Sequence, residues 1–360
     1  MANPPRVRVR ELGISPGILP VGEHNAITDV DGVLVGHTTL IEGDSIRTGV
    51  TAIRAHPGNP FQEKVIAASS VGNGFGKTAG LMQLGELGTL ESPIVLTNTL
   101  SVDTGIAGTL DWLLAQPDND TVRSANAIVG ECNDSRLNAI RSRAITREHV
   151  IHALEQAKSG PVTEGNIGGG TGMIAFGFKG GIGTSSRALP ASLGGYTLGV
   201  LVQANFGGVL TIDGRRVGEQ LSRYSFRESL ARPGSRHTDD AGESADGSCM
   251  IIIATDAPLS ARNLERVARR SFLGLARTGS FMSNGSGDVA IAFSTAIRLP
   301  HSTRATTHHF EEVRDDRISP LFLAAIEATE EAVYNALTIA ETMTGHNGVT
   351  IDALPLDGWR

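Results

Sequence analysis

The sequence predicts a mixed α/β fold with a large aliphatic core, and three observations support that prediction. Of 360 residues, 40% are hydrophobic and 19% are charged, which is enough apolar material to bury one or two sizeable cores. Glycine is abundant, with 44 residues, whereas aromatic residues make up 4%, a balance typical of many tight turns and aliphatic packing. Short β-branched runs alternate with glycine-rich turns and helical patterns along the chain.

The first half of the chain holds short strands and one clear helix. Apolar, β-branched runs at 32–37, 93–97 and 127–129 predict three strands. A helix is expected over 146–158, because Thr146 can cap its first turn, apolar residues recur at helical spacing and a glycine follows. Strands and helices mixed in this way indicate sheets covered by helices.

Residues 195–247 divide into an apolar part and a polar part. Short aliphatic runs and the turn-forming pair Asp213–Gly214 predict two strands joined by a hairpin between 195 and 217. Residues 218–247 are rich in Arg, Ser, Asp and Gly, and such a composition buries little apolar surface. We therefore expect a mobile surface loop there, which would be the main linker of the chain.

After this loop the pattern changes abruptly to that of a buried core. Residues 248–255 form a continuous apolar run with three isoleucines, which predicts a strand buried on both faces. A helix with a serine cap is expected over 260–279, followed by a strand over 288–295. The last long helix is expected to start at Ser319, with a proline in its first turn, and to end by residue 345.

Charge and cysteine content argue against several classes of protein. Lys and Arg number 31 against 38 Asp and Glu, a formal net charge of −7 without a long basic stripe, which argues against nucleic-acid binding. Cys132 and Cys249 lie far apart, outside any metal-binding spacing, and are expected to be reduced thiols. Residues 1–13 lack the apolar stretch of a signal peptide and no window reaches membrane-spanning length, so we expect a cytoplasmic protein without membrane contact.

The junction of the polar loop with the buried strand, Gly247–Ser248, is the most informative place for chemistry. A cut there would make Ser248 an N-terminal residue whose hydroxyl lies beside its own α-amine. An α-amine has a pKa near 7.7–8.0 and accepts a proton at neutral pH, so one residue would supply both nucleophile and base. Locally, a serine that merely begins a strand is the commoner case, and motifs elsewhere must decide.

Five motifs, in order along the chain, support the catalytic interpretation. They are NAITDVDGVLVGH at 25–37, NGFGKTAG at 73–80, VQANFG at 202–207, Gly247–Ser248 followed by ATDAP at 254–258, and NGSGD at 284–288. Together they resemble the L-aminopeptidase D-esterase/amidase family, a group that includes the β-aminopeptidases. The resemblance extends from about residue 13 to residue 351.

The resemblance implies an α/β (α+β) fold, a four-layer αββα sandwich of the N-terminal-nucleophile type, in a single domain over residues 1–360. It also implies an inactive precursor that cuts itself at Gly247–Ser248 into an α chain, 1–247, and a β chain, 248–360. Assembly into a homo-oligomer of αβ units is implied as well. No metal or other cofactor is expected.

The resemblance also assigns the two groups that would act on a substrate carbonyl. Ser248 matches the nucleophile, and Asn205 matches the side-chain amide that donates a hydrogen bond to the oxyanion. A preorganised donor of this kind is typically worth about 2.7–4 kcal/mol in the transition state. Without the resemblance, a turn residue before a glycine pair would explain Asn205 equally well.

Acidic residues at two places match positions that bind the substrate amine. Ser286 and Asp288 match a pair near the nucleophile, where a carboxylate would recognise a free ammonium group. Glu131 matches an acidic position that lines the site, and family members often carry an aromatic residue after it, where this chain has Cys132 and Asn133. Ordinary turns would also place Asp288 before a strand and Glu131 at the surface.

Three further signals predict structure and not ligand binding. Residues 71–78 resemble a phosphate-binding loop but lack its first glycine, so we expect a structural turn that lines the site. The glycine run 168–172 lacks the spacing of a dinucleotide site and predicts a tight turn. His308 and His309 lie among acidic residues, but adjacent histidines point apart, so we expect a solvated loop and not a metal site.

The leading hypothesis is a self-processing serine aminopeptidase or amidase that removes N-terminal amino acids through an acyl-enzyme on Ser248. Its partners would be small peptide, amide or ester substrates that begin with small L-residues, D-amino acids or β-amino acids. One alternative is an acyltransferase of the ornithine acetyltransferase type, which also cuts itself, but before a threonine. Another is a non-catalytic binding protein that keeps the fold uncut.

Overall fold

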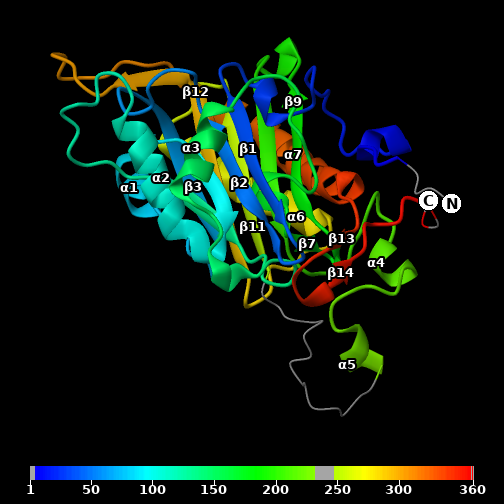
Figure 1. Ribbon diagram of the computed structural model, residues 1–360. Helices are drawn as coiled ribbons and strands as arrows, with labels where there is room; N and C mark the ends of the chain where they lie inside the picture. Colours follow the sequence, from blue (N-terminus) through cyan, green and yellow to red (C-terminus); the bar gives the residue numbers. More distant parts are fainter. Residues whose placement is uncertain (1–4, 232–246, 358, 360) are drawn as a thin grey trace.

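The protein is built in four layers, two of sheet and two of helix (Figure 1). The structure, a computed structural model, describes residues 5–231, 247–357 and 359. A four-stranded sheet and a six-stranded sheet stack face to face, and helices cover the outer face of each. The αββα sandwich predicted from the family resemblance is therefore confirmed.

The two sheets contain all the long strands of the described chain. The four-stranded sheet has the order β1-β2-β5-β6, and the six-stranded sheet has the order β4-β3-β12-β11-β10-β9. Within the larger sheet, β11 runs antiparallel to β10 and parallel to β12. The strands are β1 (Leu34–Glu42), β2 (Ile46–Arg54), β3 (Glu63–Gly74), β4 (Thr89–Leu90), β5 (Ile94–Asn98), β6 (Ile128–Cys132), β9 (Gly181–Ala188), β10 (Thr197–Asn205), β11 (Ser248–Thr255) and β12 (Gly287–Pro300).

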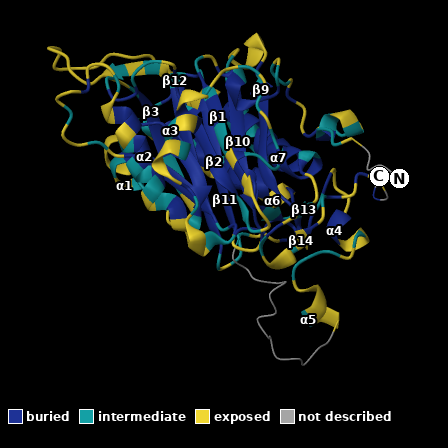
Figure 2. Ribbon diagram, viewed as in Figure 1, coloured by how far each residue is buried: buried dark blue, intermediate teal, exposed yellow. Residues whose placement is uncertain are grey.

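Three apolar layers hold the sandwich together, one between the sheets and one under each helical layer. Figure 2 shows the central strands as buried, with exposed residues in the outer helices, in the loops and at the outer end of β12. No helix among the described residues has both the length and the apolar character needed to span a bilayer. The helices are α2 (Val102–Leu114) and α3 (Arg147–Glu155) over the smaller sheet, α6 (Ala261–Arg277) and α7 (Ser319–Ile339) over the larger sheet, α1 (Leu81–Leu87) beside β3 and β4 of the larger sheet, and the short α4 (Val217–Gln220) and α5 (Arg227–Ala231).

The central strand β11 is buried along its whole length because both of its faces are covered. Cys249 and Ile251 pack in the layer under α6 and α7, whereas Met250 and Ile252 pack in the layer between the sheets. This alternation follows from the two-residue period of a strand. The side chain of Ser248 therefore belongs to the inter-sheet side of β11.

Most of the elements expected from sequence are present. The strand over 248–255 is confirmed in full, and the helix over 260–279 is confirmed as α6, with the Ser260 hydroxyl accepting from the Asn263 amide. The strand at 288–295 is part of the longer β12, and the long C-terminal helix is α7. The earlier strand runs lie within or beside β1, β5 and β6, and the helix after Thr146 is α3.

The predicted hairpin between residues 195 and 217 is wrong in its second strand. Only β10 is a strand there, and Asp213–Gly214 forms a tight turn between reciprocal backbone hydrogen bonds of Ile212 and Arg215. The reason is that β10 already has β9 on one side and β11 on the other. Residues 209 and 211 donate instead to the carbonyls of Gly279 and Thr278, at the end of α6.

The predicted loop over residues 218–247 is only partly a loop. The described part up to residue 231 contains the end of α4 and all of α5, so the expectation of irregular structure is wrong there. No residue of α5 is buried, which agrees with the predicted surface position. Residues 232–246 lie outside the described part of the chain.

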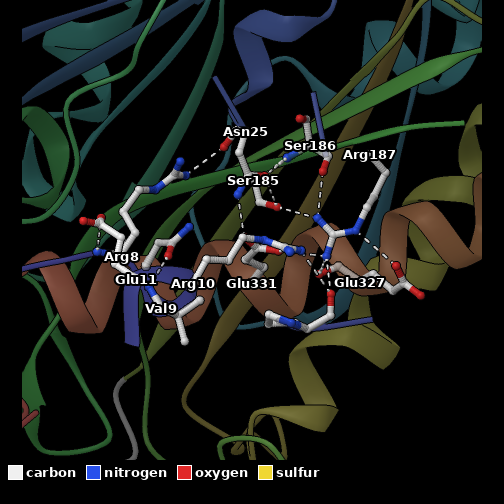
Figure 3. Close-up of polar contacts among 12 residues, drawn as sticks. Arg8, Val9, Arg10, Glu11, Asn25, Ser185, Ser186, Arg187, Glu327 and Glu331 are labelled. Carbon is white, nitrogen blue, oxygen red and sulfur yellow. Dashed lines mark hydrogen bonds and ion pairs between the residues drawn. The ribbon is translucent and has the colours of Figure 1, made fainter. Parts of the chain in front are cut away.

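Buried charges attach the N-terminal segment to β9 and α7 (Figure 3). Arg187 of β9 pairs with Glu327 at 3.1 Å and with Glu331 at 2.9 Å, and both glutamates lie on α7. From the N-terminal segment, Arg10 pairs with Glu331 at 2.6 Å, and the Asn25 amide donates to the same carboxylate. The segment before β1 is thus fixed by several directional contacts.

Candidate active site

The register of the larger sheet brings the predicted nucleophile and oxyanion donor together. Ser248, at the start of β11, lies directly across from Asn205, at the end of β10. Residues paired across two strands point to the same face, so both side chains lie at the end of the inter-sheet layer. Both are buried, with 3% of Ser248 and 4% of Asn205 exposed.

The peptide bond before Ser248 is held in a narrow place. The Gly247 carbonyl accepts a hydrogen bond from the Gly287 amide at 3.1 Å. A Cβ atom on residue 247 would lie 2.9 Å from the Cα of Phe206 and 3.1 Å from the carbonyl oxygen of Asn205. Glycine is therefore required at this position for β10 and the bond before β11 to approach so closely.

Two backbone groups orient the side-chain amide of Asn205. Its Oδ1 accepts from the Ile174 amide at 2.9 Å, and its Nδ2 donates to the Asn133 carbonyl at 3.1 Å. A primary amide carries two N–H donors, and the second has no acceptor among the described residues. The amide is thus fixed at both ends with one donor left for another molecule. This is what an oxyanion donor requires, and a residue of a free turn would not need it.

A pocket opens next to the Gly247–Ser248 bond. Asn205 and Gly247 both line it. The rings of Phe176 and Phe206 meet edge to face in its wall, with centroids 5.1 Å apart. The pocket therefore offers an apolar, aromatic wall close to the Asn205 amide and the residue before Ser248. The aromatic residues of the lining are Phe176, Phe206, Tyr224, Phe226 and Phe281.

Asp288 lies on the other face of the sheet, behind the nucleophile. It pairs with Cys249 across β11 and β12, so its side chain is on the side of α6. The carboxylate is 0% exposed, and neither its oxygens nor the Ser286 hydroxyl has a hydrogen-bond partner of normal geometry among the described residues. Burial raises the pKa of Asp288 to about 6, although the nearby Ser286 hydroxyl and Cys249 amide act in the opposite direction.

Glu131 is buried within β6, so the alternative of a surface turn is wrong. Its Oε1 accepts from the Lys77 amide at 3.1 Å, and its Oε2 accepts from the Thr99 hydroxyl. The Lys77 ammonium lies 4.0 Å from the same carboxylate. Unlike Asp288, Glu131 is therefore already supplied with donors from the protein.

The prediction of a turn over the glycine-rich run 71–78 is wrong in its first half, because residues 71–74 are the end of strand β3 and only 75–78 are irregular. The Asn73 side chain donates to the carbonyls of Ser283 and Ser286 and so holds the NGSGD turn in place. The Phe75 amide also donates to the Ser286 carbonyl, at 3.2 Å. The two motifs thus act as one unit beside Ser248.

The other two weak motifs have the predicted character. Residues 168–170 form a buried single turn, in agreement with the expected tight turn. His308 and His309 lie in an exposed irregular segment, as expected of a solvated loop.

The Cys132 side chain contacts the backbone of Ser248, the candidate nucleophile, and the sequence did not predict this contact. Its thiol donates to the carbonyl oxygens of Ser248, at 3.4 Å, and Gln203, at 3.5 Å. Burial raises the pKa of Cys132 to about 12, so the group remains a thiol. The residue after Glu131 therefore contacts the backbone of Ser248, the candidate nucleophile.

Backbone groups of Ile174 and Asn133 are the other contributors that the sequence did not reveal. They act through a peptide N–H and a peptide carbonyl, which every residue except proline can supply. No pattern of residue types could have identified them.

An αββα sandwich whose central strand opens with a buried serine, opposite a fixed amide donor, defines a hydrolase of the N-terminal-nucleophile type. The model of peptidase family S58 matches residues 25–351, so the chain belongs to that family and is a peptidase. The beta-peptidyl aminopeptidase BapA of Sphingosinicella microcystinivorans is 40% identical over 362 residues, which cover 97% of this chain and 89% of the relative.

Solved structures agree with this assignment. A protein of Pyrococcus horikoshii OT3 has a TM-score of 0.88 and 47% identity, covering 97% of this chain and 96% of that chain. The L-aminopeptidase D-Ala-esterase/amidase of Ochrobactrum anthropi, described as a new variant of the Ntn hydrolase fold, has a TM-score of 0.85 and 38% identity. The latter comparison covers 96% of this chain and 95% of that chain.

Proposed function

We propose that this protein is a serine aminopeptidase and amidase that cuts its own chain before Ser248 and then uses Ser248 as its nucleophile. The observation that carries the proposal is the pairing of Ser248, at the first position of a buried strand, with the fixed amide of Asn205. A cut at this bond would expose the Ser248 amine beside its hydroxyl, at the edge of a pocket.

The first reaction is an acyl shift within the chain. The Ser248 hydroxyl oxygen attacks the Gly247 carbonyl carbon, and the peptide C–N bond breaks as the nitrogen takes up a proton. Water then hydrolyses the resulting ester, which leaves a carboxylate on Gly247 and restores the hydroxyl beside a free α-amine. The Gly287 amide, 3.1 Å from the Gly247 oxygen, supports this step because it can stabilise negative charge there.

The two products would stay together after the cut. β11 and β12 belong to residues 248–360, and they lie between β3 and β10 of residues 1–247. The ion pairs of Arg187 with Glu327 and Glu331 also join the two parts. One αβ unit would therefore persist as a single body, which is the unit that we propose assembles into a homo-oligomer.

The catalytic cycle repeats the same chemistry on a substrate. The Ser248 α-amine accepts the hydroxyl proton as the oxygen attacks the first carbonyl of the substrate, and the free N–H of Asn205 stabilises the oxyanion. The proton passes to the leaving amine or alcohol. Water then releases the amino acid from the acyl-enzyme, and no cofactor is needed for any of these steps.

Asp288, with Ser286 beside it, is the proposed binding group for ammonium ions at this site. Its carboxylate is buried, and neither oxygen has a hydrogen bond of normal geometry among the described residues. It lies beside the Cys249 amide, so the Ser248 α-amine would be its nearest ammonium group, and the substrate amine would approach from the pocket. Glu131 is a second acidic group on the β6 side of the site.

The proposed substrates are small peptides, amides and esters with a free amino group. The names of the relatives, a beta-peptidyl aminopeptidase and an L-aminopeptidase D-Ala-esterase/amidase, support this class. Small L-residues, D-amino acid amides or esters, and β-amino acids all fall within it. We propose a cytoplasmic location for the enzyme.

The test is the mass of the purified protein and of its Ser248→Ala variant. We expect wild type to yield two chains, the shorter beginning at Ser248, and the variant to remain one inactive chain. Ser302→Ala, at an exposed position, is the matched control and should be cut like wild type. Full aminopeptidase activity from an uncut wild-type chain would contradict the proposal, as would transfer of acetyl groups from acetylornithine to glutamate as the main activity.

A further inference from the structure

We infer that Lys179 is a positioning residue for the reaction, which fixes the oxyanion amide of Asn205 through the turn that precedes β7 (Ile174–Ala175). The inference rests on the proposed function, because it assigns a role to a residue that does not itself touch the substrate. Lys179 is the last residue of β8 (Phe178–Lys179), which pairs with β7.

The buried ammonium group of Lys179 holds the backbone of the 170–180 segment through three hydrogen bonds. Its side chain is 0% exposed, and its Nζ donates to the carbonyls of Gly170 at 3.2 Å, Met173 at 2.8 Å and Gly180 at 2.8 Å. An ammonium has three N–H donors, so these three contacts use all of them. The cation is therefore fully engaged in holding the ends of the 170–180 segment together.

The turn held by Lys179 is the one that fixes Asn205. Met173, whose carbonyl accepts from Lys179, is followed by Ile174, whose amide donates to Oδ1 of Asn205 at 2.9 Å. Peptide groups are rigid planes, so fixing the carbonyl of Met173 also fixes the N–H of Ile174. The chain of contacts from Nζ to the oxyanion amide is thus two hydrogen bonds long.

A second buried charge acts on the other end of the same amide. The carbonyl of Asn133 accepts from Nδ2 of Asn205, and the next residue, Asp134, is 1% exposed. Asp134 holds its own loop, since its carboxylate accepts from the Asn138 side chain at 3.0 Å and its carbonyl accepts from the Asn138 amide at 2.9 Å. Both ends of the Asn205 amide are therefore anchored to segments that a buried charged residue organises.

Burying these two charges is costly, which argues that they are kept for a purpose other than packing. Burial lowers the pKa of Lys179 to about 7, although Asp134 opposes this shift. Burial raises the pKa of Asp134 to about 7. Apolar residues of the same volume would avoid this penalty, whereas only a directional donor can hold three carbonyls in one arrangement.

The expected consequence is a loss of kcat without a matching rise in KM. A displacement of about 1 Å in a reacting or stabilising group can lower a rate by about 10²-fold. Lys179→Met removes the three donors and keeps the length of the side chain. We expect it to lower kcat by about 10–10²-fold and to leave KM nearly unchanged, because the pocket wall is intact.

The experiment is a double-mutant cycle of Lys179→Met with Asn205→Ala. The rates are expressed per cut chain, so that slow self-cleavage is not counted as slow catalysis. Asn205→Ala alone should lower kcat by about 10²–10³-fold. If Lys179 acts through Asn205, adding Lys179→Met to Asn205→Ala should cost less than about threefold more. Losses that multiply would overturn the inference and leave the proposed function standing.

Controls separate this role from general stability. Lys64→Met removes a lysine that pairs with Glu91 at the start of β3, away from the site, and should alter the melting temperature without altering kcat. If Lys179→Met does not fold, Lys179→Gln, which keeps an N–H donor, takes its place in the cycle with the same expected non-additivity. An unchanged kcat in Asn205→Ala would overturn the proposed oxyanion role and this inference with it.

Discussion

Two clusters of buried charge in this protein are organised in opposite ways. Around Arg187, each buried charge faces an opposite one, with Glu327 at 3.1 Å, Glu331 at 2.9 Å and Arg10 completing the group (Figure 3). Behind the nucleophile, the carboxylate of Asp288 is equally buried, yet neither oxygen has a hydrogen bond of normal geometry among the described residues. The charges around Arg187 are thus paired within the protein, whereas the Asp288 carboxylate is not paired with a cation among the described residues.

The acid–base properties of the two clusters differ accordingly. Burial alone would raise the pKa of Glu331, but the guanidinium groups of Arg10 and Arg187 outweigh it and hold this pKa below its usual value. No cation faces Asp288 in this way among the described residues, and burial raises its pKa to about 6. A carboxylate in such surroundings favours either a proton or a positively charged ligand.

The contrast between the paired charges around Arg187 and the unpaired carboxylate of Asp288 indicates where a buried group lowers the stability of the folded chain. The Arg187 cluster holds together parts of the chain that lie on both sides of the proposed cut. An ionised Asp288 would destabilise the folded chain, and the ammonium group that we propose it binds would be its partner. The following predictions test this contrast, from the largest expected effect to the smallest.

Removing Arg187 from its cluster of ion pairs should have the largest effect on the free energy of unfolding. In the uncut Ser248→Ala protein, Arg187→Met would leave Glu327 with no cation partner and Glu331 with Arg10 alone. We expect the free energy of unfolding in urea to fall by about 3–5 kcal/mol, the usual cost of removing one partner of a buried pair. A loss below about 1 kcal/mol would show that the cluster is not a source of stability.

Neutralising Asp288 should raise the free energy of unfolding, the opposite of the effect expected for Arg187→Met. Its folded pKa is raised from 3.8 to about 6, so the stability linked to this group is present at low pH and is lost as pH rises between those values. In the Ser248→Ala background, Asp288→Asn should therefore be more stable at pH 7, by up to about 3 kcal/mol at 1.36 kcal/mol per pKa unit.

Urea unfolding of both proteins between pH 4 and pH 7 measures this effect. The two curves should nearly meet at pH 4 and separate as pH rises, because the variant lacks the titrating group. Equal stability of the two proteins at pH 7 would mean that Asp288 already has a partner in the folded chain.

The same substitution in the self-cutting enzyme should lower activity. A charge-assisted hydrogen bond shielded from water contributes about 1.5–3 kcal/mol, so Asp288→Asn should reduce kcat/KM about 10–10²-fold on alanine p-nitroanilide. The N-acetylated substrate should be poor with both enzymes. Equal hydrolysis of both substrates by wild type would contradict the aminopeptidase assignment.

The ratio between the two substrates distinguishes which ammonium Asp288 binds. A ratio that changes in the variant indicates the substrate amine. A ratio that stays constant while both rates fall indicates the Ser248 α-amine and leaves Glu131 as the group for the substrate.

The smallest effect is expected where a charge pair is exposed to solvent. Arg269 and Glu265 pair one turn apart on the outer face of α6, with side chains 58% and 45% exposed. Arg269→Ala should change the free energy of unfolding by no more than about 0.5 kcal/mol. This variant is the control for Arg187→Met, and a comparable loss in both would mean that burial does not explain the contrast.

Much of the local structure could be predicted because it depends on short-range patterns. The strand at 248–255 follows from an unbroken apolar run, and α6 follows from helical spacing after a capping serine. The second strand of the hairpin after β10 could not be excluded in this way. Its absence depends on β11, a distant segment that occupies the free edge of β10.

In the candidate site, too, residue types could be predicted from the sequence, whereas spatial relations could not. The candidate site residues, among them Ser248, Asn205, Asp288 and Glu131, could be named from motifs, because the proposed chemistry requires particular side chains at particular places. Their relations could not, since Asp288 and Ser248 lie on opposite faces of the sheet only through the register of β11 with β12. The motifs also did not predict that the Lys77 amide and the Thr99 hydroxyl donate hydrogen bonds to Glu131.

The sequence by itself predicted a mixed α/β fold from its periodicity, and its motifs, through their resemblance to a known family, predicted the peptidase family and the αββα class; the cut before Ser248 stays a prediction of the same resemblance. Only the tertiary structure decided which groups orient the Asn205 amide, that Cys132 contacts Ser248, and that Asp288 has no hydrogen bond of normal geometry among the described residues where Glu331 has several. The physical reason is that hydrogen bonds and desolvation depend on which groups the packing brings within about 3 Å of each other, and residues 31 to 321 positions apart in the sequence meet there only in the folded chain.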